Sequence, residues 1–195
     1  EVCQNHNGDR KTFEKMVKAA AEAGADIVKM QSIFSKDLTR REEFEEGETL
    51  PDGTIKTIKR PYRAEFERLS KLDLTLDDHR RFIKLCVRNG VIPMTTIFAR
   101  HRIKEIGALP WPGRMVKVAS YDCASLQFLR ELAQHFDHLI ISTGATYDAE
   151  IKRTAKMLSS LGKKFSFLQC VTSYPNELSS CHLSRMHWLR KLSPE

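Results

Sequence analysis

Two lysines interrupt apolar runs of the sequence, and polar side chains follow where such runs end. Lys29 lies within the run Ile27–Gln31, and Lys117 lies within Met115–Ala119. Burying an ammonium group without a partner costs several kcal/mol, so each lysine needs a carboxylate, a route to solvent or an anionic ligand. The polar residues at the ends of these and similar runs are Thr95, Thr96, Ser120, Asp122, Ser142, Thr143, Gln169, Thr172 and Tyr174.

Lysines and hydroxyls at neighbouring strand ends are typical of a pocket for a small anion, because Ser and Thr hydroxyls donate hydrogen bonds to anionic oxygens. A second interpretation is that each lysine pairs with a nearby carboxylate or extends its ammonium to solvent. A third is that one lysine forms a Schiff base with a carbonyl substrate. Glu1, Asn5 and His6, near the end of the first predicted strand, are further candidates for the pocket.

The elements that position these residues alternate between short apolar strands and amphipathic helices. Helical spacing of apolar residues predicts helices over 12–24, 76–89, 100–107, 125–135, 148–161 and 183–192. Strands are predicted over 1–4, 27–31, 91–97, 115–119, 138–142 and 165–170. Thr75 and Asp78 form a capping-box pattern at the start of one helix, which Gly90 ends.

Strand-then-helix units with no hairpin between the strands require a parallel sheet with crossover helices. No G-x-G-x-x-G or P-loop motif follows a predicted strand, so an open nucleotide-binding sheet lacks its usual signature. The sequence therefore predicts an α/β fold, which is either an open doubly wound sheet or a (β/α)8 TIM barrel with about six of its eight units present in this chain.

Residues 35–72 interrupt this alternation with a highly charged insertion after the second strand. The segment Leu50–Thr54 reads LPDGT, a turn signal that predicts the tip of a small hairpin. An insertion at this point lies over the carboxyl-terminal mouth of a barrel, and it is interpreted either as a lid or as solvated decoration.

The composition is that of a globular protein, with 41% hydrophobic and 29% charged residues among 195. The formal net charge is +7, but basic and acidic residues are interleaved, as in Arg40-Arg41-Glu42-Glu43, so no nucleic-acid partner is predicted. The densest basic stretch, Arg185–Lys191, carries apolar residues at helical spacing and is predicted to form a solvated helix face.

Neither a membrane span nor a secretory leader is expected, because no apolar run approaches about 20 residues and no charged-then-apolar segment opens the sequence. The cysteines are odd in number and form no C-x-x-C pair, which argues against a disulfide framework and a structural zinc site. Reduced thiols and a cytoplasmic location are the resulting expectations. The five cysteines are Cys3, Cys86, Cys123, Cys170 and Cys181.

Six short blocks occur in order along the chain, each at a strand end. Residues 1–8 read EVCQNHNG and residues 23–31 read AGADIVKMQ. The other four blocks are TTIF at 95–98, KVASYD at 117–122, ISTG at 141–144, and LQC at 168–170 with Tyr174-Pro175. In this order they resemble the blocks of the sialic acid synthase family, N-acetylneuraminate synthase and its relatives, which open with E-I-G-x-N-H-x-G and A-G-A-D-x-x-K-x-Q.

The resemblance implies a barrel that condenses phosphoenolpyruvate with an N-acetylated hexosamine, such as N-acetylmannosamine, to give a sialic-acid-type nonulosonate and phosphate. Carried over by position, the residues that bind phosphoenolpyruvate are Lys29, Thr96, Lys117, Ser120, Ser142 and Thr172. Gln31, Asp122 and Tyr174 fall where the family contacts the sugar. Glu1 matches a catalytic glutamate near the aldehyde and its attacking water.

The resemblance also implies a divalent metal, Mn²⁺ or Mg²⁺, which the family binds through histidines on strands seven and eight, the first within G-x-S-D-H. These ligands are expected beyond residue 195, so no metal ligand is assigned to this chain. The family's C-terminal antifreeze-like domain is likewise absent from the sequence, and the chain is interpreted as an incomplete catalytic barrel. For the complete protein the resemblance implies a homodimer.

Several positions depart from the family blocks. Cys3, Ile97 and Ala119 replace Gly, Pro and Gly, and Gln169 stands where many bacterial members have His. These departures leave the identity and phosphorylation state of the hexosamine open. Two alternatives also remain: an aldolase or lyase that uses Lys29 or Lys117 as a Schiff base, and a degenerate barrel that binds a ligand without turnover.

Overall fold

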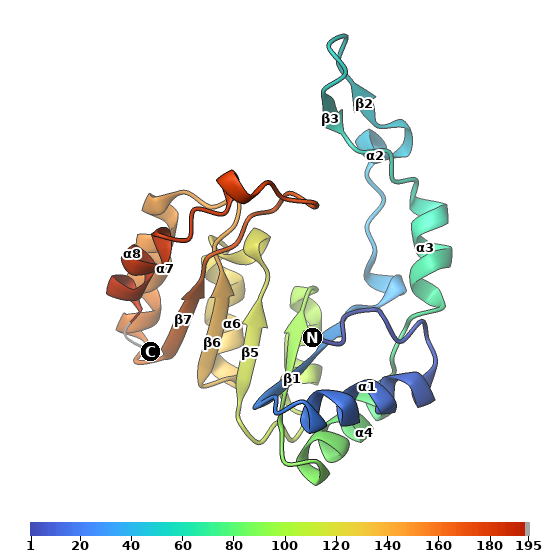
Figure 1. The fold of residues 1–195 in the computed structure, drawn as a ribbon, viewed down its shortest axis with the longest axis vertical. Helices are drawn as coiled ribbons and strands as arrows, with labels where there is room; N and C mark the ends of the chain where they lie inside the picture. The colour runs from blue at the N-terminus through green and yellow to red at the C-terminus, as the bar shows by residue number, and fades with distance from the viewer. Residues whose placement is uncertain (194–195) are drawn as a thin grey trace.

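The computed structural model describes residues 1–193, which form a curved parallel sheet with helices packed along one face (Figure 1). The sheet has five strands, and every neighbouring pair is parallel. In spatial order they are β1 (Ile27–Ser32), β4 (Ile92–Ile97), β5 (Met115–Val118), β6 (His138–Ser142) and β7 (Lys164–Leu168). Parallel neighbours joined by crossover helices confirm the predicted α/β class.

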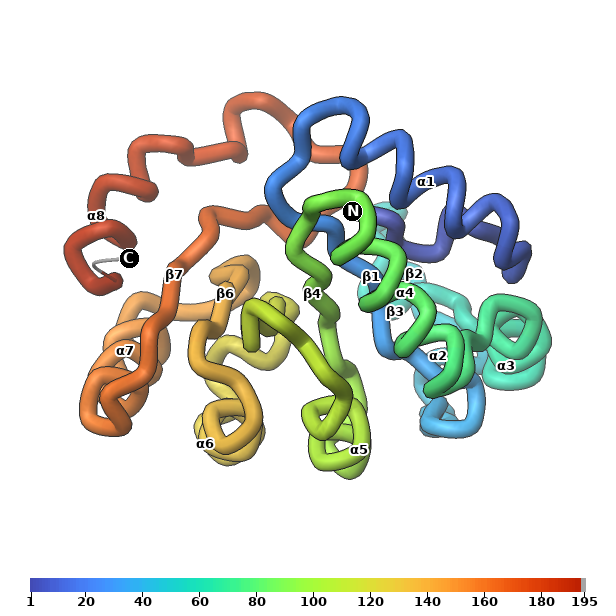
Figure 2. The backbone as a smooth tube through the Cα atoms, turned by 90° about the horizontal axis from the view of Figure 1, so that it is seen from below, coloured from blue at the N-terminus to red at the C-terminus, as the bar shows by residue number. Residues whose placement is uncertain are grey.

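The connecting helices are α1 (Arg10–Glu22), α4 (Leu76–Arg88), α5 (Ile103–Gly107), α6 (Leu126–His135), α7 (Asp148–Ser160) and α8 (Arg185–Leu192). Figure 2 shows α5, α6 and α7 side by side along one face of the sheet. Strand side chains that point to this face, such as Val28, Met30 and Val116, are buried with the helices in a single core. Each such side chain contributes about 1.5–3 kcal/mol when it leaves water.

Burial alternates along β1, so that its residues divide between two faces. Val28, Met30 and Ser32 are buried, whereas Lys29 and Gln31 remain partly exposed. Because successive side chains of a strand point to opposite faces, Lys29 and Gln31 lie on the face away from the helices, here called the inner face.

The strand predicted over residues 1–4 is wrong in extent, because it is reduced to a single bridge. Cys3 pairs in parallel with Met30, and the Val2 amide donates to the Lys29 carbonyl at 2.9 Å. Cys3 has a φ of +52°, and residues 4–8 form a turn. A left-handed residue followed by a turn ends the extended pairing, so five strands and one bridge stand where six strands were predicted.

The capping box predicted before α4 is confirmed. The Thr75 hydroxyl accepts from the Asp78 amide at 3.1 Å, and the Asp78 carboxylate accepts from the Thr75 amide at 2.9 Å. The Asp78 carboxylate also pairs with Arg10 at 3.0 Å, which ties α4 to α1. The Asp78 side chain therefore both caps the start of α4 and holds α1 against it.

The insertion at 35–72 stands out from the end of the sheet at which the strands finish (Figure 1). It contains α2 (Glu42–Glu46), the antiparallel hairpin of β2 (Glu48–Thr49) and β3 (Ile55–Thr57), and α3 (Tyr62–Ser70). The predicted hairpin is confirmed, whereas α3 was not predicted. At Gly47, with φ +69°, an added Cβ would lie 2.7 Å from the Lys59 amide nitrogen, so this corner requires glycine.

Other predictions concern charge and thiols. The basic stretch near the end forms α8, in which Leu189 is buried while Met186 is exposed. All five cysteines are free. Within residues 1–193, no helix combines the length and the apolar character needed to cross a bilayer.

Candidate functional site

Lys29 lies on the inner face of β1 with both a hydroxyl and a carboxylate beside it. Its ammonium donates to the Thr96 hydroxyl on β4 at 3.2 Å and forms an ion pair with the Glu1 carboxylate. The Lys29 side chain is only 13% exposed, whereas that of Glu1 is 44% exposed. The pairing of a lysine with a nearby carboxylate, considered from the sequence, therefore occurs at Lys29. The Glu1 carboxylate is the more exposed partner.

Lys117 occupies the equivalent face of β5, in register next to Thr96. Its ammonium donates to the Ser142 hydroxyl on β6 at 2.5 Å and to the Val118 carbonyl at 2.8 Å. Among residues 1–193 no carboxylate forms an ion pair with it. Burial first, and then the positive charge of Lys29, lower the pKa of Lys117 to about 8.

The two lysines therefore share one electrostatic environment. The Lys29 charge depresses the pKa of Lys117 and the Glu1 charge raises it, so all three groups interact. Two ammonium groups against one carboxylate leave the inner face positive at neutral pH. A partly buried positive site with hydroxyls on its neighbours can bind an anion.

Ser120 and Thr172 meet at a glycine that follows β6. The Gly144 amide donates to the Ser120 hydroxyl at 3.2 Å. A Cβ added at Gly144 would lie 2.7 Å from the Thr172 methyl carbon and 3.0 Å from the Ser120 hydroxyl oxygen. Glycine is thus required for the segments after β5, β6 and β7 to approach one another, which brings together the predicted hydroxyls of three strand ends.

The predicted sugar contacts lie in two places. Asp122 ends the 3-10 turn Ser120–Asp122 after β5, and burial raises the pKa of its carboxyl. Tyr174 is 85% exposed, and Cys170 first, and then burial, raise its pKa, with Tyr121 contributing as well. Because Tyr121 precedes Asp122 in this turn, Tyr174 lies near the segment that carries Asp122.

Gln31 lies apart from that pair, on β1, two strands away from β5. Its side-chain oxygen is buried without a hydrogen-bond partner among the described residues, as is that of Gln169. Such an atom costs about 1–3 kcal/mol until a donor satisfies it. Gln31 therefore presents an acceptor suited to a ligand hydroxyl or amide.

Two features of the site were not predicted. Cys170 lies close enough to Lys117 and Tyr174 to affect the pKa of both, although its sequence position signals only the end of a strand. His6, considered for the pocket, is instead buried edge-on against Phe13, with its Nδ1 accepting from the Gly8 amide at 3.0 Å. Burial lowers the pKa of His6, which is a structural residue.

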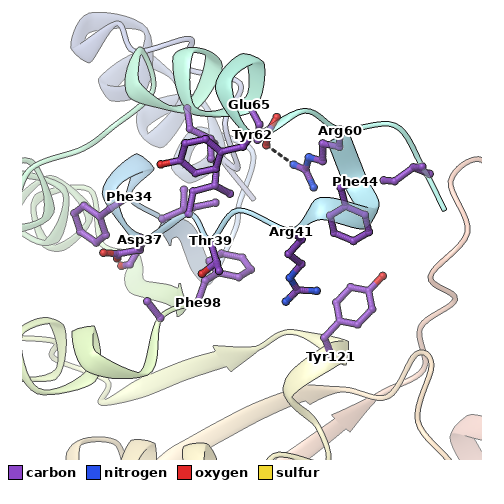
Figure 3. Close-up of a pocket in the computed structure, with 16 residues that line it drawn as sticks. Phe34, Asp37, Thr39, Arg41, Phe44, Arg60, Tyr62, Glu65, Phe98 and Tyr121 are labelled. Carbon is purple, nitrogen blue, oxygen red and sulfur yellow. Dashed lines mark hydrogen bonds and ion pairs between the residues drawn. The ribbon is translucent and has the colours of Figure 1, made fainter. Parts of the chain in front are cut away.

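A cavity of about 600 Å³ lies beside these strand ends, walled on one side by the insertion 35–72 (Figure 3). Its lining includes Ser32, the last residue of β1, Ala99, which follows β4, and Tyr121, the neighbour of Ser120 and Asp122. The insertion thus forms one wall of a cavity beside the predicted site.

The described residues do not supply a metal centre. Within residues 1–193 there is no group of three or more His, Cys, Asp or Glu side chains that could hold a metal ion. Glu1, the carboxylate nearest the lysines, is engaged by Lys29. These residues alone therefore do not fit the divalent cation that the resemblance implies.

Comparison with known proteins finds a family model and several relatives that are similar to this chain in sequence. The sequence model of the NeuB family matches residues 16–193. An N,N'-diacetyllegionaminic acid synthase of Campylobacter jejuni is 26% identical over 97% of this chain and 55% of its own length. The human N-acetylneuraminate-9-phosphate synthase is 24% identical over 100% of the chain and 52% of its length. The chain thus spans about half the length of the curated relatives it matches.

Solved structures show the same fold. The N-acetylneuraminic acid synthetase of Leptospira borgpetersenii, crystallised with citrate, superposes with a TM-score of 0.75 at 21% identity, over 97% of this chain and 59% of that one. A phospho-2-dehydro-3-deoxyheptonate aldolase of Thermotoga maritima gives a TM-score of 0.58 at 8% identity, over 91% and 44% of the two chains. At these identities the likeness concerns the fold alone.

Proposed function

The chain belongs to the NeuB family, and from that premise we propose that it takes part in the condensation of phosphoenolpyruvate with an N-acetylated hexosamine. The products are a sialic-acid-type nonulosonate and inorganic phosphate, and N-acetylmannosamine or a relative is the acceptor. The observation that carries the proposal is the pair of lysines on the inner face, of which Lys29 donates to Thr96 and pairs with Glu1, while Lys117 donates to Ser142 and has no carboxylate partner among residues 1–193.

Lys29 and Lys117 neutralise the phosphate and carboxylate of phosphoenolpyruvate. The hydroxyls of Thr96 and Ser142 accept hydrogen bonds from these ammonium groups, so their own protons stay available for the ligand. Ser120 is poised in the same way, because its oxygen accepts from the Gly144 amide. Thr172, packed beside Gly144, adds a further hydroxyl.

In the proposed reaction, C3 of phosphoenolpyruvate forms a bond to the aldehyde carbon of the open-chain sugar. The carbonyl π bond breaks, the aldehyde oxygen takes its electron pair and a proton, and C2 becomes an oxocarbenium centre. Water adds at C2 and loses a proton, for which Glu1 is the acceptor. The C–O bond to phosphate then breaks, phosphate leaves with the bonding electrons, and the new C2 hydroxyl gives up its proton to the departing phosphate as C2 becomes a ketone. Fixed positive charge close to both anionic groups stabilises this sequence. Gln31, Asp122 and Tyr174 contact the sugar.

The proposal also includes a divalent cation, Mn²⁺ or Mg²⁺. Residues 1–193 offer no group of ligands for this cation, and no step of the reaction is assigned to it. We further propose that the complete protein is a homodimer and is located in the cytoplasm. The location is supported by the five free thiols.

The direct test uses the protein expressed from its complete reading frame, supplied with phosphoenolpyruvate, N-acetylmannosamine and Mn²⁺. We expect inorganic phosphate release that depends on the sugar, with a nine-carbon keto acid detected by mass spectrometry. Phosphoenolpyruvate binding without phosphate release, across a panel of N-acetylhexosamines and their phosphate esters, would instead establish a binding protein without turnover.

A Schiff-base aldolase is the second candidate, and the pKa of Lys117, about 8, is what favours it. About a tenth of such an amine is neutral, and thus nucleophilic, at pH 7. Borohydride reduction in the presence of pyruvate separates the two mechanisms. A mass increase on the peptide that carries Lys117 supports the aldolase, and an unmodified peptide in a protein that releases phosphate supports the synthase.

A further inference from the structure

The outer faces of α1 and α4, formed by their exposed residues, hold an excess of positive charge. The two helices pack side by side (Figure 1), and the ion pair between Arg10 and Asp78 joins them. Together they carry eight Lys and Arg residues against four Asp and Glu residues, a net charge of +4 out of +7 for the whole sequence. Such a concentration of one sign of charge attracts partners of the opposite sign.

Six of these eight cations have no carboxylate partner. Among residues 1–193, Arg10 pairs with Asp78 and Arg81 pairs with Asp77, each at 3.0 Å. The remaining six are exposed and form no ion pair within the described part of the chain: Lys11, Lys15, Lys18, Arg80, Lys84 and Arg88. None of them lines the cavity beside the strand ends. Their charge is therefore available to a partner.

The insertion 35–72 shows the opposite arrangement. Its exposed cations are matched by carboxylates at 2.9–3.0 Å in the pairs Lys56–Glu48, Lys59–Glu46 and Arg63–Glu67. Interleaved charges in the sequence thus neutralise one another in the insertion but not on the outer faces of α1 and α4.

On α4, three of the unpaired cations form a row. Arg80, Lys84 and Arg88 follow at intervals of four residues, which places them along one side of the helix over about 12 Å. Like charges four residues apart repel each other and destabilise a helix. A second helix with carboxylates at the same interval matches this row and relieves the repulsion. Val87, next to Arg88, is 55% exposed and offers an apolar contact.

We propose that the outer faces of α1 and α4 dock an acidic helix of a partner protein. Its carboxylates, four residues apart, pair with Arg80, Lys84 and Arg88, and arginine binds a carboxylate through two parallel hydrogen bonds. The cations of α1 extend the positive surface beside this row. The inference goes beyond the proposed condensation and does not rest on it.

The composition of these faces favours a protein over a membrane or a nucleic acid. The cations are interrupted by three exposed carboxylates, those of Glu14, Glu22 and Asp77, which a uniformly anionic surface would repel. Carboxylates of a protein stand at discrete positions and can avoid them. Within the described residues, α1 and α4 expose no Trp, Phe or Leu, the side chains with which surface helices enter a bilayer.

The test uses the protein expressed from its complete reading frame and two fluorescein-labelled helical peptides, one with Glu at every fourth position and one with Gln there. Fluorescence anisotropy at about 0.15 M salt measures the affinity for each peptide. We expect the Glu peptide to bind at least roughly tenfold more tightly than the Gln peptide. The triple variant Arg80→Gln, Lys84→Gln and Arg88→Gln should lose this difference.

The matched control is the triple variant Lys56→Gln, Lys59→Gln and Arg63→Gln, which removes the same charge from paired cations of the insertion. It should bind the Glu peptide as the wild type does. The α4 variant should keep the melting temperature and the phosphate release of the wild type, so that a loss of peptide binding is separated from unfolding and from a failure of the condensation.

A photoreactive amino acid in place of Val87 extends the test to the natural partner. We expect a cross-link in cells to a helix rich in Asp and Glu, mapped by mass spectrometry, that is lost when the α4 substitutions are added. Equal weakening of peptide binding in both triple variants would overturn the proposal. Tighter binding of phosphatidylserine vesicles or of a short DNA duplex than of the Glu peptide would overturn it too, in favour of a membrane or a nucleic acid.

Discussion

Two adjacent threonines on β4 show how the two faces of one sheet differ. Thr95 points to the helices and Thr96 to the inner face, and both are buried. The Thr95 hydroxyl lies 2.7 Å from that of Ser32, which lies 2.9 Å from His79 Nε2. The Thr96 hydroxyl instead accepts from the Lys29 ammonium.

The direction of the hydrogen bonds that join Thr95, Ser32 and His79 follows from the partner of His79. His79 Nδ1 lies 2.8 Å from the Thr75 carbonyl oxygen and must donate to it, so Nε2 accepts from Ser32 and Ser32 accepts from Thr95. Every proton on the helix side is therefore used within the protein. On the inner face the Thr96 hydroxyl accepts from Lys29 and keeps its own proton to donate. The proposed ligand-binding hydroxyl is therefore distinguished from the structural one by its partners and not by its residue type.

The largest expected effect is the loss of His79. His79→Ala removes a fully buried ring and leaves Ser32 without its acceptor, so the free energy of unfolding should fall by about 3 kcal/mol. Urea denaturation measures this. Because the change lies on the helix side, the KM for phosphoenolpyruvate of the remaining folded protein should stay within about twofold; a large KM increase would mean that the two faces are not separable.

Lys117→Met tests the inner face, where we expect a loss of kcat/KM without a loss of stability. A charge-assisted contact is worth about 1.5–3 kcal/mol, so kcat/KM for phosphoenolpyruvate should fall at least roughly tenfold. Removing a half-buried ammonium that lacks an ion pair should leave the melting temperature unchanged or raised. A lower melting temperature with unaltered kinetics would assign Lys117 a structural role.

Stability should also depend on pH through the helix-side network. Burial lowers the pKa of His79 below its usual 6.5 and outweighs the opposing effects of the Thr75 carbonyl, Asp78 and Glu105; the pKa of His6 is lowered too. The unfolded chain then binds protons first as the pH falls below about 6.5, so stability is complete above that value and declines beneath it, by at most about 1.4 kcal/mol per pH unit for each group.

Urea midpoints between pH 7.5 and 5 measure this slope above the range in which most carboxylates titrate. His79→Gln should flatten it, leaving the part due to His6. A slope identical to that of the wild type would show that the pKa of His79 is the same in the folded and the unfolded protein.

Much of the fold was predictable because apolar periodicity is a local property. The alternating burial of β1, the capping box of Thr75 and Asp78 and the hairpin turn at Leu50–Thr54 all depend on neighbours in sequence. Helix α3 escaped prediction because its inward face consists of Glu65 and Leu69. A carboxylate buried only because two arginines pair with it gives no apolar signal.

The sequence was enough to predict which strand ends carry the site residues, but not which side chains those residues contact. Lys29 and Lys117 stand out as cations in apolar runs, yet only the fold shows that Glu1 pairs with the first and Ser142 with the second. Arg40 and Arg41 are indistinguishable in an interleaved charge run. Their roles diverge because Glu45 pairs with one and the other faces the cavity.

The most direct test of the central claim compares Thr95→Val with Thr96→Val, two changes of one hydroxyl to a methyl on adjacent residues. Calorimetric titration with phosphoenolpyruvate should give an affinity about fivefold weaker for Thr96→Val, or about 1 kcal/mol, with an unchanged melting temperature. Thr95→Val should lose about 1 kcal/mol of stability and keep its affinity. Equal affinities in both variants and the wild type, or equal losses in both, would contradict the assignment of the inner face as the anion site.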